Sequence, residues 1–240
     1  MRITQQKNAS INNSNNSLID FMTLSSRYSK LELIPYDALL RTKEWIEKRT
    51  EILKRDGHVC TRCKRRSTKQ FKARDIQQMI KTDKKKVDWF RVGNDLKLPD
   101  QIEDSHYWFF SIETLNKSSA YYRDCKYLKY KDGDSVFALI KASKRYSLNI
   151  HHKLYIINKL PWDYLDSDLE TICNWCHWEL HETEKVKSYK IVEGGLEPTS
   201  LTPCERCNGA GWLPKYEHVE GGLCFKCLGF KFEELIQSKK

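Results

Sequence analysis

The stretch 173-CNWCHWELH-181 holds two cysteines and two histidines within nine residues. Cys173 and Cys176 form a Cys-x-x-Cys pair, which presents two thiolates to one metal ion. His177 and His181 are four residues apart, so on a helix they share one face, with about 5–6 Å between their Cβ atoms. This spacing suits two ligands of one divalent ion. We therefore expect a helix that begins inside this stretch and carries metal ligands of two chemical kinds.

A second pair of histidines ends an expected strand in 147-SLNIHHKLYIIN-158. Adjacent residues on a strand point to opposite faces, so His151 and His152 should have different roles. One of them could join His177 and His181 as a third ligand, which leaves open positions on the ion for water or substrate. The other could act as a general base, because imidazole titrates near neutral pH. The alternative is a closed structural site in which His177 joins three cysteines.

Eight of the nine cysteines fall into Cys-x-x-Cys pairs, namely Cys60/Cys63, Cys173/Cys176, Cys204/Cys207 and Cys224/Cys227. The last two pairs are 16 residues apart, a normal gap for a compact zinc ribbon, whereas 109 residues separate the first two. One pair alone cannot close a tetrahedral site, so we expect two structural Zn²⁺ ions. Disulfides are the alternative. The ninth residue, Cys125, is interpreted as a small buried apolar side chain.

Composition predicts a soluble globular protein, with 31% charged and 40% hydrophobic residues. No apolar run approaches the ~20 residues of a membrane span, and the N-terminal residues lack the apolar core of a signal peptide. We therefore expect a cytoplasmic protein with no membrane partner. In that reducing compartment, cysteine pairs more often bind metal than form disulfides.

The formal net charge is +10, and one segment accounts for it. From Arg41 to Lys86 there are 17 Lys and Arg against 6 Asp and Glu. A basic block of this kind indicates a polyanionic partner, most often nucleic acid. A solvated helix face is the alternative. The segment from Pro161 to Glu184 is the opposite, with 7 acidic residues and no Lys or Arg.

Local signals define several further elements. A helix is expected from Thr42, which can cap its start, to Gly57, which can end it. Asp132-Gly133 between two apolar segments predicts a hairpin. Residues 1–17, rich in Asn, Ser and Gln, are expected to form a disordered tail. The stretch 193-EGGLEP-198 looks like a linker that opens a four-cysteine C-terminal module of residues 193–240.

Three segments together resemble an HNH endonuclease of the cysteine-containing kind. They are 44-EWIEKRTEILKRDGHVCTRC-63, 148-LNIHHKLYI-156 and 161-PWDYLDSDLETICNWCHWELH-181, and the resemblance covers a little under a third of the chain. It implies an α+β fold, in which an HNH ββα-metal core with a structural zinc knuckle lies within a nuclease domain of residues 18–192. A mixed α/β insertion at residues 67–146 and a small C-terminal zinc ribbon complete the expected organisation. The implied activity is metal-dependent hydrolysis of DNA phosphodiester bonds, with RNA kept as an alternative substrate.

The resemblance also implies a role for each matching residue. His152 matches the general base, and His151, His177 and His181 match the ligands of one catalytic divalent ion. That ion is expected to be Mg²⁺ or Mn²⁺, with Zn²⁺ or Ni²⁺ as further candidates. The structural zinc knuckle matches Cys60, Cys63, Cys173 and Cys176, and the second structural zinc belongs to Cys204, Cys207, Cys224 and Cys227. The expected contacts to nucleic acid are Arg62, Lys64, Arg65, Arg66, Lys69 and Lys72.

Two features depart from the family pattern. Asp168 occupies the family's Asn position, where it can still accept a hydrogen bond and orient the loop that carries the base. The 87 residues between Cys63 and His151 are more than the family's usual gap, which is why an insertion is expected. Asp168 keeps an alternative function open, that of a non-cleaving, zinc-stabilised nucleic-acid-binding module or adaptor. The C-terminal module resembles short zinc modules that bind nucleic acid or protein, so a protein partner there is also considered; the oligomeric state is left open.

Overall fold

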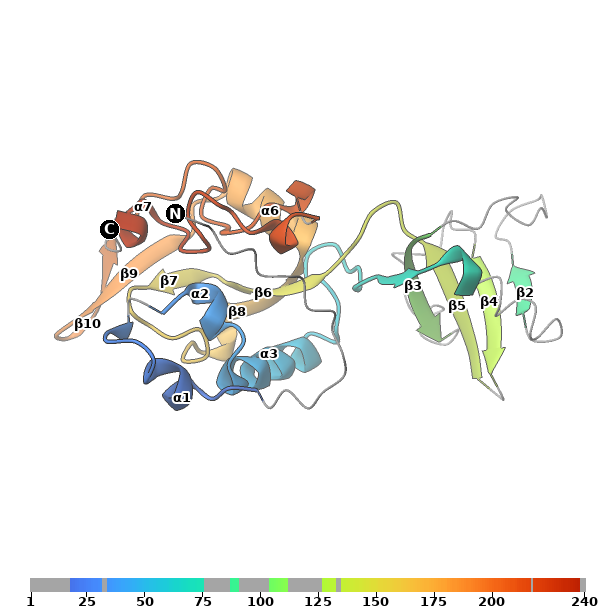
Figure 1. Ribbon diagram of the computed structural model, residues 1–240, viewed down its shortest axis with the longest axis horizontal. Helices are drawn as coiled ribbons and strands as arrows, with labels where there is room; N and C mark the ends of the chain where they lie inside the picture. The colour runs from blue at the N-terminus through green and yellow to red at the C-terminus, as the bar shows by residue number, and fades with distance from the viewer. Residues whose placement is uncertain are drawn as a thin grey trace, which may run out of the picture.

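The computed structural model describes residues 18–31, 34–75, 87–90, 104–111, 127–132, 135–216 and 218–237. Three helices are followed by a run of strands, and a further helix lies between the last strands, in a mixed α+β fold whose described strands form three small sheets. In Figure 1 the largest sheet lies at one end, and the remaining elements gather at the other. Two expectations, the tail of residues 1–17 and a buried Cys125, lie outside the described residues.

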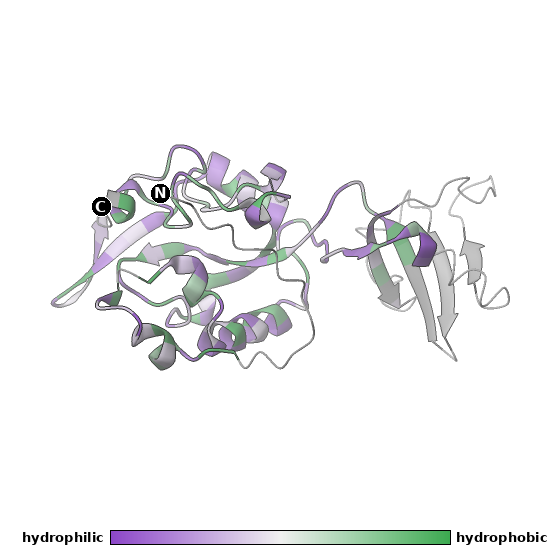
Figure 2. Ribbon diagram, in the orientation of Figure 1, coloured by the Kyte–Doolittle hydropathy of each residue, from purple (hydrophilic) through white to green (hydrophobic). Residues whose placement is uncertain are grey.

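Helix α3 (Lys43–Arg55) is the helix expected from Thr42 to Gly57, and the structure confirms it. The Thr42 hydroxyl accepts a hydrogen bond from the Trp45 amide, and Gly57 follows the helix with a φ of 66°. One face of α3 is buried, and hydrophobic and hydrophilic residues alternate along the ribbon in Figure 2. Two short helices, α1 (Phe21–Ser25) and α2 (Tyr36–Leu39), precede it.

The centre of the fold is a strand, strand, helix unit. Strand β6 (Leu148–His152) pairs antiparallel with β8 (Leu169–Cys173), so that His151 lies opposite Glu170. A single 3-10 turn, η3 (Asp166–Asp168), leads into β8, and α6 (Asn174–Thr183) follows β8 directly. Figure 1 shows the two strands between α3 and α6. This places successive residues of β6 alternately toward one helix and the other.

A three-stranded sheet extends the central unit. Strand β7 (Leu154–Ile156) pairs in parallel with β9 (Lys187–Val192), which pairs antiparallel with β10 (Gly195–Thr199). The interpretation of residues 193–198 as a linker is therefore wrong. Gly194 and Gly195 adopt φ values of 96° and 146°, which let the chain reverse within a tight turn and form a hairpin.

The five-stranded sheet is built from residues within 69–141, in the order β1-β3-β5-β4-β2. Its strands are β1 (Lys69–Phe71), β2 (Val87–Phe90), β3 (Ser105–Ser111), β4 (Tyr127–Asp132) and β5 (Ser135–Lys141). The predicted hairpin is confirmed, because Asp132 pairs with Ser135 across β4 and β5. The sheet joins the central unit where the Thr68 amide donates to the Tyr146 carbonyl and Trp108 packs on the Tyr146 ring.

The C-terminal residues fold around their own small core. The four cysteines of this segment are buried together with Ala210. Isolated bridges join Pro203 to Phe232 and Trp212 to Leu223. Short helical turns, η4 (Pro214–Tyr216), η5 (Glu220–Gly222) and α7 (Glu233–Gln237), complete it. Because β10 (Gly195–Thr199) belongs to the three-stranded sheet, we use a narrower range than the expected 193–240 and call residues 202–216 and 218–237 the C-terminal module. Within the described residues, none of the helices has the length and apolar character needed to span a membrane.

Candidate metal centres

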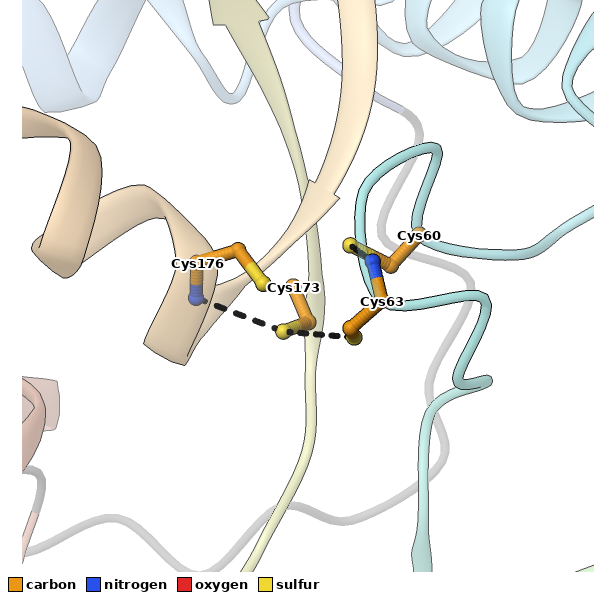
Figure 3. A group of neighbouring side chains, drawn as sticks. All are labelled: Cys60, Cys63, Cys173 and Cys176. Carbon is orange, nitrogen blue, oxygen red and sulfur yellow. Dashed lines mark hydrogen bonds between the residues drawn. The ribbon is translucent and has the colours of Figure 1, made fainter. Parts of the chain in front are cut away.

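The first cysteine cluster connects two distant parts of the chain. Cys60 and Cys63 lie on the turn after α3, whereas Cys173 ends β8 and Cys176 lies in α6, and Figure 3 shows the four side chains converging. The sulfurs of Cys63 and Cys173 are 3.7 Å apart. Tetrahedral zinc with bonds of ~2.3 Å places its sulfur ligands roughly 3.8 Å apart. This cluster therefore has the geometry of a structural zinc site.

The thiols of this cluster lie close enough to form hydrogen bonds with one another. Hydrogen bonds with the neighbouring thiols lower the pKa of Cys60 and raise that of Cys173. The Cys63 and Cys176 amides donate to the sulfurs of Cys60 and Cys173, both at 3.4 Å. Such amides stabilise thiolates, which are the form of cysteine that binds zinc. The chemistry of the four donors thus fits Zn²⁺.

The second cysteine cluster lies in the C-terminal module and has similar geometry. Sulfur distances are 4.0 Å for Cys204 and Cys224 and 3.6 Å for Cys207 and Cys227. The Gly211 amide donates to the Cys207 sulfur at 3.2 Å. All four cysteines are buried. This cluster also suits a structural zinc ion. Both expected cysteine sites therefore have four sulfurs placed where one zinc ion could bind them.

The third cluster consists of His151, His177 and His181. Their ring nitrogens lie within 4.8 Å of one another, and the cluster contains no carboxylate among the described residues. Strand β6 supplies His151 and helix α6 supplies the other two, one turn apart. The Nε2 atoms of His177 and His181 are 3.2 Å apart. Ligands at ~2.0–2.1 Å from a tetrahedral ion have roughly this separation.

Two further observations fit a cation between these rings. The His151 Nδ1 atom is buried and has no hydrogen-bond partner within the described part of the chain, a costly arrangement that a bound ion would relieve. His181 Nδ1 lies 3.2 Å from the Asn208 carbonyl, which can only accept, so Nδ1 carries the proton and Nε2 keeps its lone pair. Burial lowers the pKa of His151 to about 2 and of His181 to about 4, which keeps both rings neutral.

His152 points to the other face of β6, as alternation along a strand requires. Its ring stacks on Trp45 and meets Tyr164 edge to face, with centroids 5.6 and 4.5 Å apart. The Nε2 atom lies 3.0 Å from the Pro161 carbonyl and therefore carries the proton, which leaves Nδ1 as an acceptor. Burial lowers the His152 pKa to about 3, so this imidazole is neutral at pH 7. Tyr164 and Pro161, which hold this ring, are not among the residues that the sequence pattern singles out.

Asp168 is the last residue of η3 and directly precedes strand β8. Its backbone carbonyl accepts from the Lys153 amide at 2.8 Å, one residue beyond His152. Its carboxylate accepts from the Ser167 hydroxyl at 3.5 Å, whereas the His152 ring bonds to Pro161. The structure therefore places Asp168 at the loop that follows His152 and gives it a backbone contact there.

The basic residues expected to bind nucleic acid surround the first cysteine cluster and the start of the large sheet. Arg62 pairs with Glu170 and Glu184, at 3.6 and 3.4 Å. Arg65 donates to the Tyr146 hydroxyl, and the Lys64 amine donates to the Thr61 carbonyl. Arg66 is half-buried, and Lys69 and Lys72 are exposed. None of the six lines the cavity next to His177.

A cavity of about 750 Å³ reaches the histidine cluster at His177. Helix α3 and strand β6 form one wall and the C-terminal module forms the other; we call it the main cavity. Its basic residues are Arg41, Arg49, Arg145 and Lys231. Arg41 and Arg49 belong to the basic segment from Arg41 to Lys86, whereas the sequence does not single out Arg145 and Lys231, which join them only in the folded chain.

Lys231 connects the C-terminal module to the histidine region. Its carbonyl accepts from the Cys204 amide, while its amine donates to the Tyr155 hydroxyl at 3.0 Å and lies 4.6 Å from the ring centroid of Tyr36. No carboxylate forms an ion pair with Lys231 in the part of the chain that the structure describes. Lys231 also has a φ of 70°, an unfavourable conformation for a residue with a side chain, which often marks functional positions.

In comparisons with known proteins, no family model, no curated protein and no solved structure matches the chain.

Proposed function

We propose that this protein is a metal-dependent endonuclease of the HNH type that hydrolyses DNA phosphodiester bonds. The observation that carries the proposal is the division of the four imidazoles on β6 and α6. Three of them converge as a neutral ligand set, and the fourth, His152, lies on the opposite face with one ring nitrogen fixed by Pro161. The HNH resemblance implies this arrangement for a strand, strand, helix unit whose ends are joined by a cysteine cluster.

The charge around the three histidines favours an anionic ligand. Three neutral imidazoles leave the full double charge on a divalent ion, because no carboxylate of the described chain joins the cluster. Lys231 and Arg49 line the main cavity beside it. A phosphodiester, with its single negative charge and two free oxygens, suits this environment better than a neutral or cationic substrate does.

In this proposal His152 accepts the proton of the attacking water. Its Nδ1 is the acceptor, because Nε2 donates to the Pro161 carbonyl. Stacking on Trp45 and the edge contact with Tyr164 hold the ring in one orientation. A divalent ion, when bound, supplies charge stabilisation at a phosphate oxygen and at the leaving oxygen. His152 also lines a second cavity of about 120 Å³, which is large enough for a few water molecules.

The proposal is tested by incubating the full-length, zinc-loaded protein with circular DNA in a series of Mg²⁺, Mn²⁺, Ni²⁺ and Zn²⁺. We expect cleavage with at least one of these ions and its loss in His151→Ala, with two zinc ions retained per chain. The matched control is His218→Ala, which removes an exposed imidazole that lies outside the cluster. Cleavage by His151→Ala at the parent rate would rule out the proposed ligand set.

One observation favours a second candidate function, that of a non-cleaving, zinc-stabilised nucleic-acid-binding module. His152 is only 3% exposed, so some rearrangement is needed to bring a scissile phosphate next to its ring. DNA binding that weakens steeply with salt, with no cleavage under any divalent ion, would favour this second function.

A further inference from the structure

We infer that the substrate is a single strand of DNA, which reaches the histidine site through the main cavity between α3, β6 and the C-terminal module. The inference rests on the proposed function and adds the form of the substrate. It also gives the C-terminal module a role as one wall of the substrate path.

The three histidines of the metal cluster are nearly closed off from solvent. His151, His177 and His181 are 3, 9 and 5% exposed. Residues of the C-terminal module, from Ala210 to Lys231, face β6 across the main cavity. A scissile phosphate must therefore enter between two walls, and the strand that carries it cannot remain inside a wide, stacked helix.

The volume of the main cavity suits one strand rather than two. Pockets of roughly 300–1,000 Å³ enclose a ligand of drug size, so the main cavity of about 750 Å³ has room for about one or two nucleotides. Duplex DNA is much larger, since its major groove alone is about 12 Å wide. Both of its strands, with their paired bases, would have to enter the cavity together. A single strand can bend at each nucleotide and thread one phosphate at a time.

Charged side chains lie on both walls of the main cavity. The α3 and β6 side has Arg41, Arg49 and Arg145 with Asp37, which pairs with Arg41, and the module side has Lys231 with Glu220. The lining therefore has four cationic side chains against two carboxylates. The Arg49 guanidinium donates to the Leu148 carbonyl at 3.0 Å, a contact that fixes its position and leaves its charge uncompensated by that partner. An excess of cations spread over both walls suits the backbone of one strand, in which successive phosphates of B-DNA are about 3.4 Å apart along the helix axis.

The direct test compares cleavage of one labelled 40-nucleotide sequence, free of self-complementarity, as a single strand and as a duplex. We expect the zinc-loaded, full-length protein with its active divalent ion to cut the single strand at least about 10-fold faster. A duplex that is cut as fast as the single strand, or faster, would overturn the inference while leaving the endonuclease intact. If neither is cut with any ion, the proposed function fails, and fluorescence anisotropy with the same two DNAs still decides whether the cavity prefers one strand.

The role of the module wall is tested with Lys231→Gln. We expect single-strand binding to weaken about 3- to 10-fold, with a salt dependence smaller by about one phosphate contact. Lys187→Gln is the matched control, because Lys187 is an exposed lysine on β9 outside the main cavity. If Lys231→Gln fails to retain its zinc, Arg145→Gln on the opposite wall takes its place in the test, with the same expected loss of binding. Unchanged binding in the zinc-loaded cavity variants would overturn the assignment of the path.

Discussion

The backbone carbonyl of Asn208 lies 3.2 Å from Nδ1 of His181. Asn208 follows the second cysteine of the C-terminal module, and His181 belongs to the histidine cluster on α6. The module therefore contacts a candidate metal ligand through a backbone atom whose position depends on the adjacent cysteine. A partner on the second ring nitrogen fixes the tautomer and the orientation of a metal-binding histidine.

This contact predicts that the two metal sites are coupled. In Cys204→Ser/Cys224→Ser the module loses its zinc, so the Asn208 carbonyl no longer holds the His181 ring. We expect Mn²⁺ or Ni²⁺ to bind the histidine cluster about 10- to 100-fold more weakly, the usual effect of removing such a partner. Titration calorimetry on the full chain measures this. The matched control is Lys226→Gln, which changes the module surface but keeps its cysteines. Equal affinity in the cysteine variant would show that the module does not orient His181.

The histidine cluster predicts one divalent site in addition to the two zinc sites. His177→Ala removes one of the three imidazole ligands of the cluster, so we expect loss of the third ion with both zinc ions retained. Metal analysis after equilibrium dialysis against Ni²⁺ measures the stoichiometry. His218→Ala should keep all three ions. A third ion that persists in His177→Ala would place the site elsewhere.

The first cysteine cluster predicts a large effect of zinc on stability. It joins the turn after α3 to the end of β8, and a zinc ion in such a site contributes folding free energy directly. We expect Cys63→Ser to bind one zinc instead of two and to unfold at a clearly lower temperature. Thermal unfolding followed by circular dichroism, with zinc analysis of the same sample, measures both. Retention of two zinc ions in this variant would contradict the assignment of Cys63 as a ligand.

The central unit predicts a sensitive core position at Ile172. This residue of β8 is fully buried, one residue before Cys173. Ile172→Ala should lower the free energy of unfolding by about 2–5 kcal/mol, because it leaves a cavity beside the metal sites. Leu165→Ala provides the control, since Leu165 is 68% exposed, and a change within about 0.5 kcal/mol is expected there. Denaturant unfolding at constant zinc measures the difference. Equal costs at the two positions would mean that Ile172 is not part of a packed core.

Elements marked by local chemistry could be predicted from the sequence. Helix α3 has its cap at Thr42 and one apolar face, and the hairpin near Asp132 has a turn signal between two apolar strands. Both signals act within a few residues, so the structure agrees with them. Each Cys-x-x-Cys turn is likewise a local motif, and the structure brings the four pairs together as two clusters. The α+β class and the joining of Cys60 and Cys63 to Cys173 and Cys176 are what the HNH resemblance implies, because spacing alone does not pair segments 109 residues apart.

Contacts between distant segments could not be predicted in this way. Residues 193–198 look like a linker in the sequence, whereas pairing with β9 makes residues 195–198 part of strand β10. Pro161 and Tyr164 contact His152 only after the loop before η3 folds back. Lys231 joins the histidine region only once the C-terminal module packs against β7 and α2. The number of charged residues in the C-terminal module does not indicate that Lys231 in particular lies next to the histidines.

The central claim is that His152 activates the water that cleaves DNA at an ion held by the other three histidines. Its most direct test is the single-turnover rate of DNA cleavage by the wild-type protein and by His152→Ala, at equal zinc content and with saturating divalent ion. We predict that the variant binds the divalent ion as tightly as the parent but cleaves about 10²–10⁴-fold more slowly, the usual contribution of a general base. Cleavage by His152→Ala at the parent rate would contradict the account.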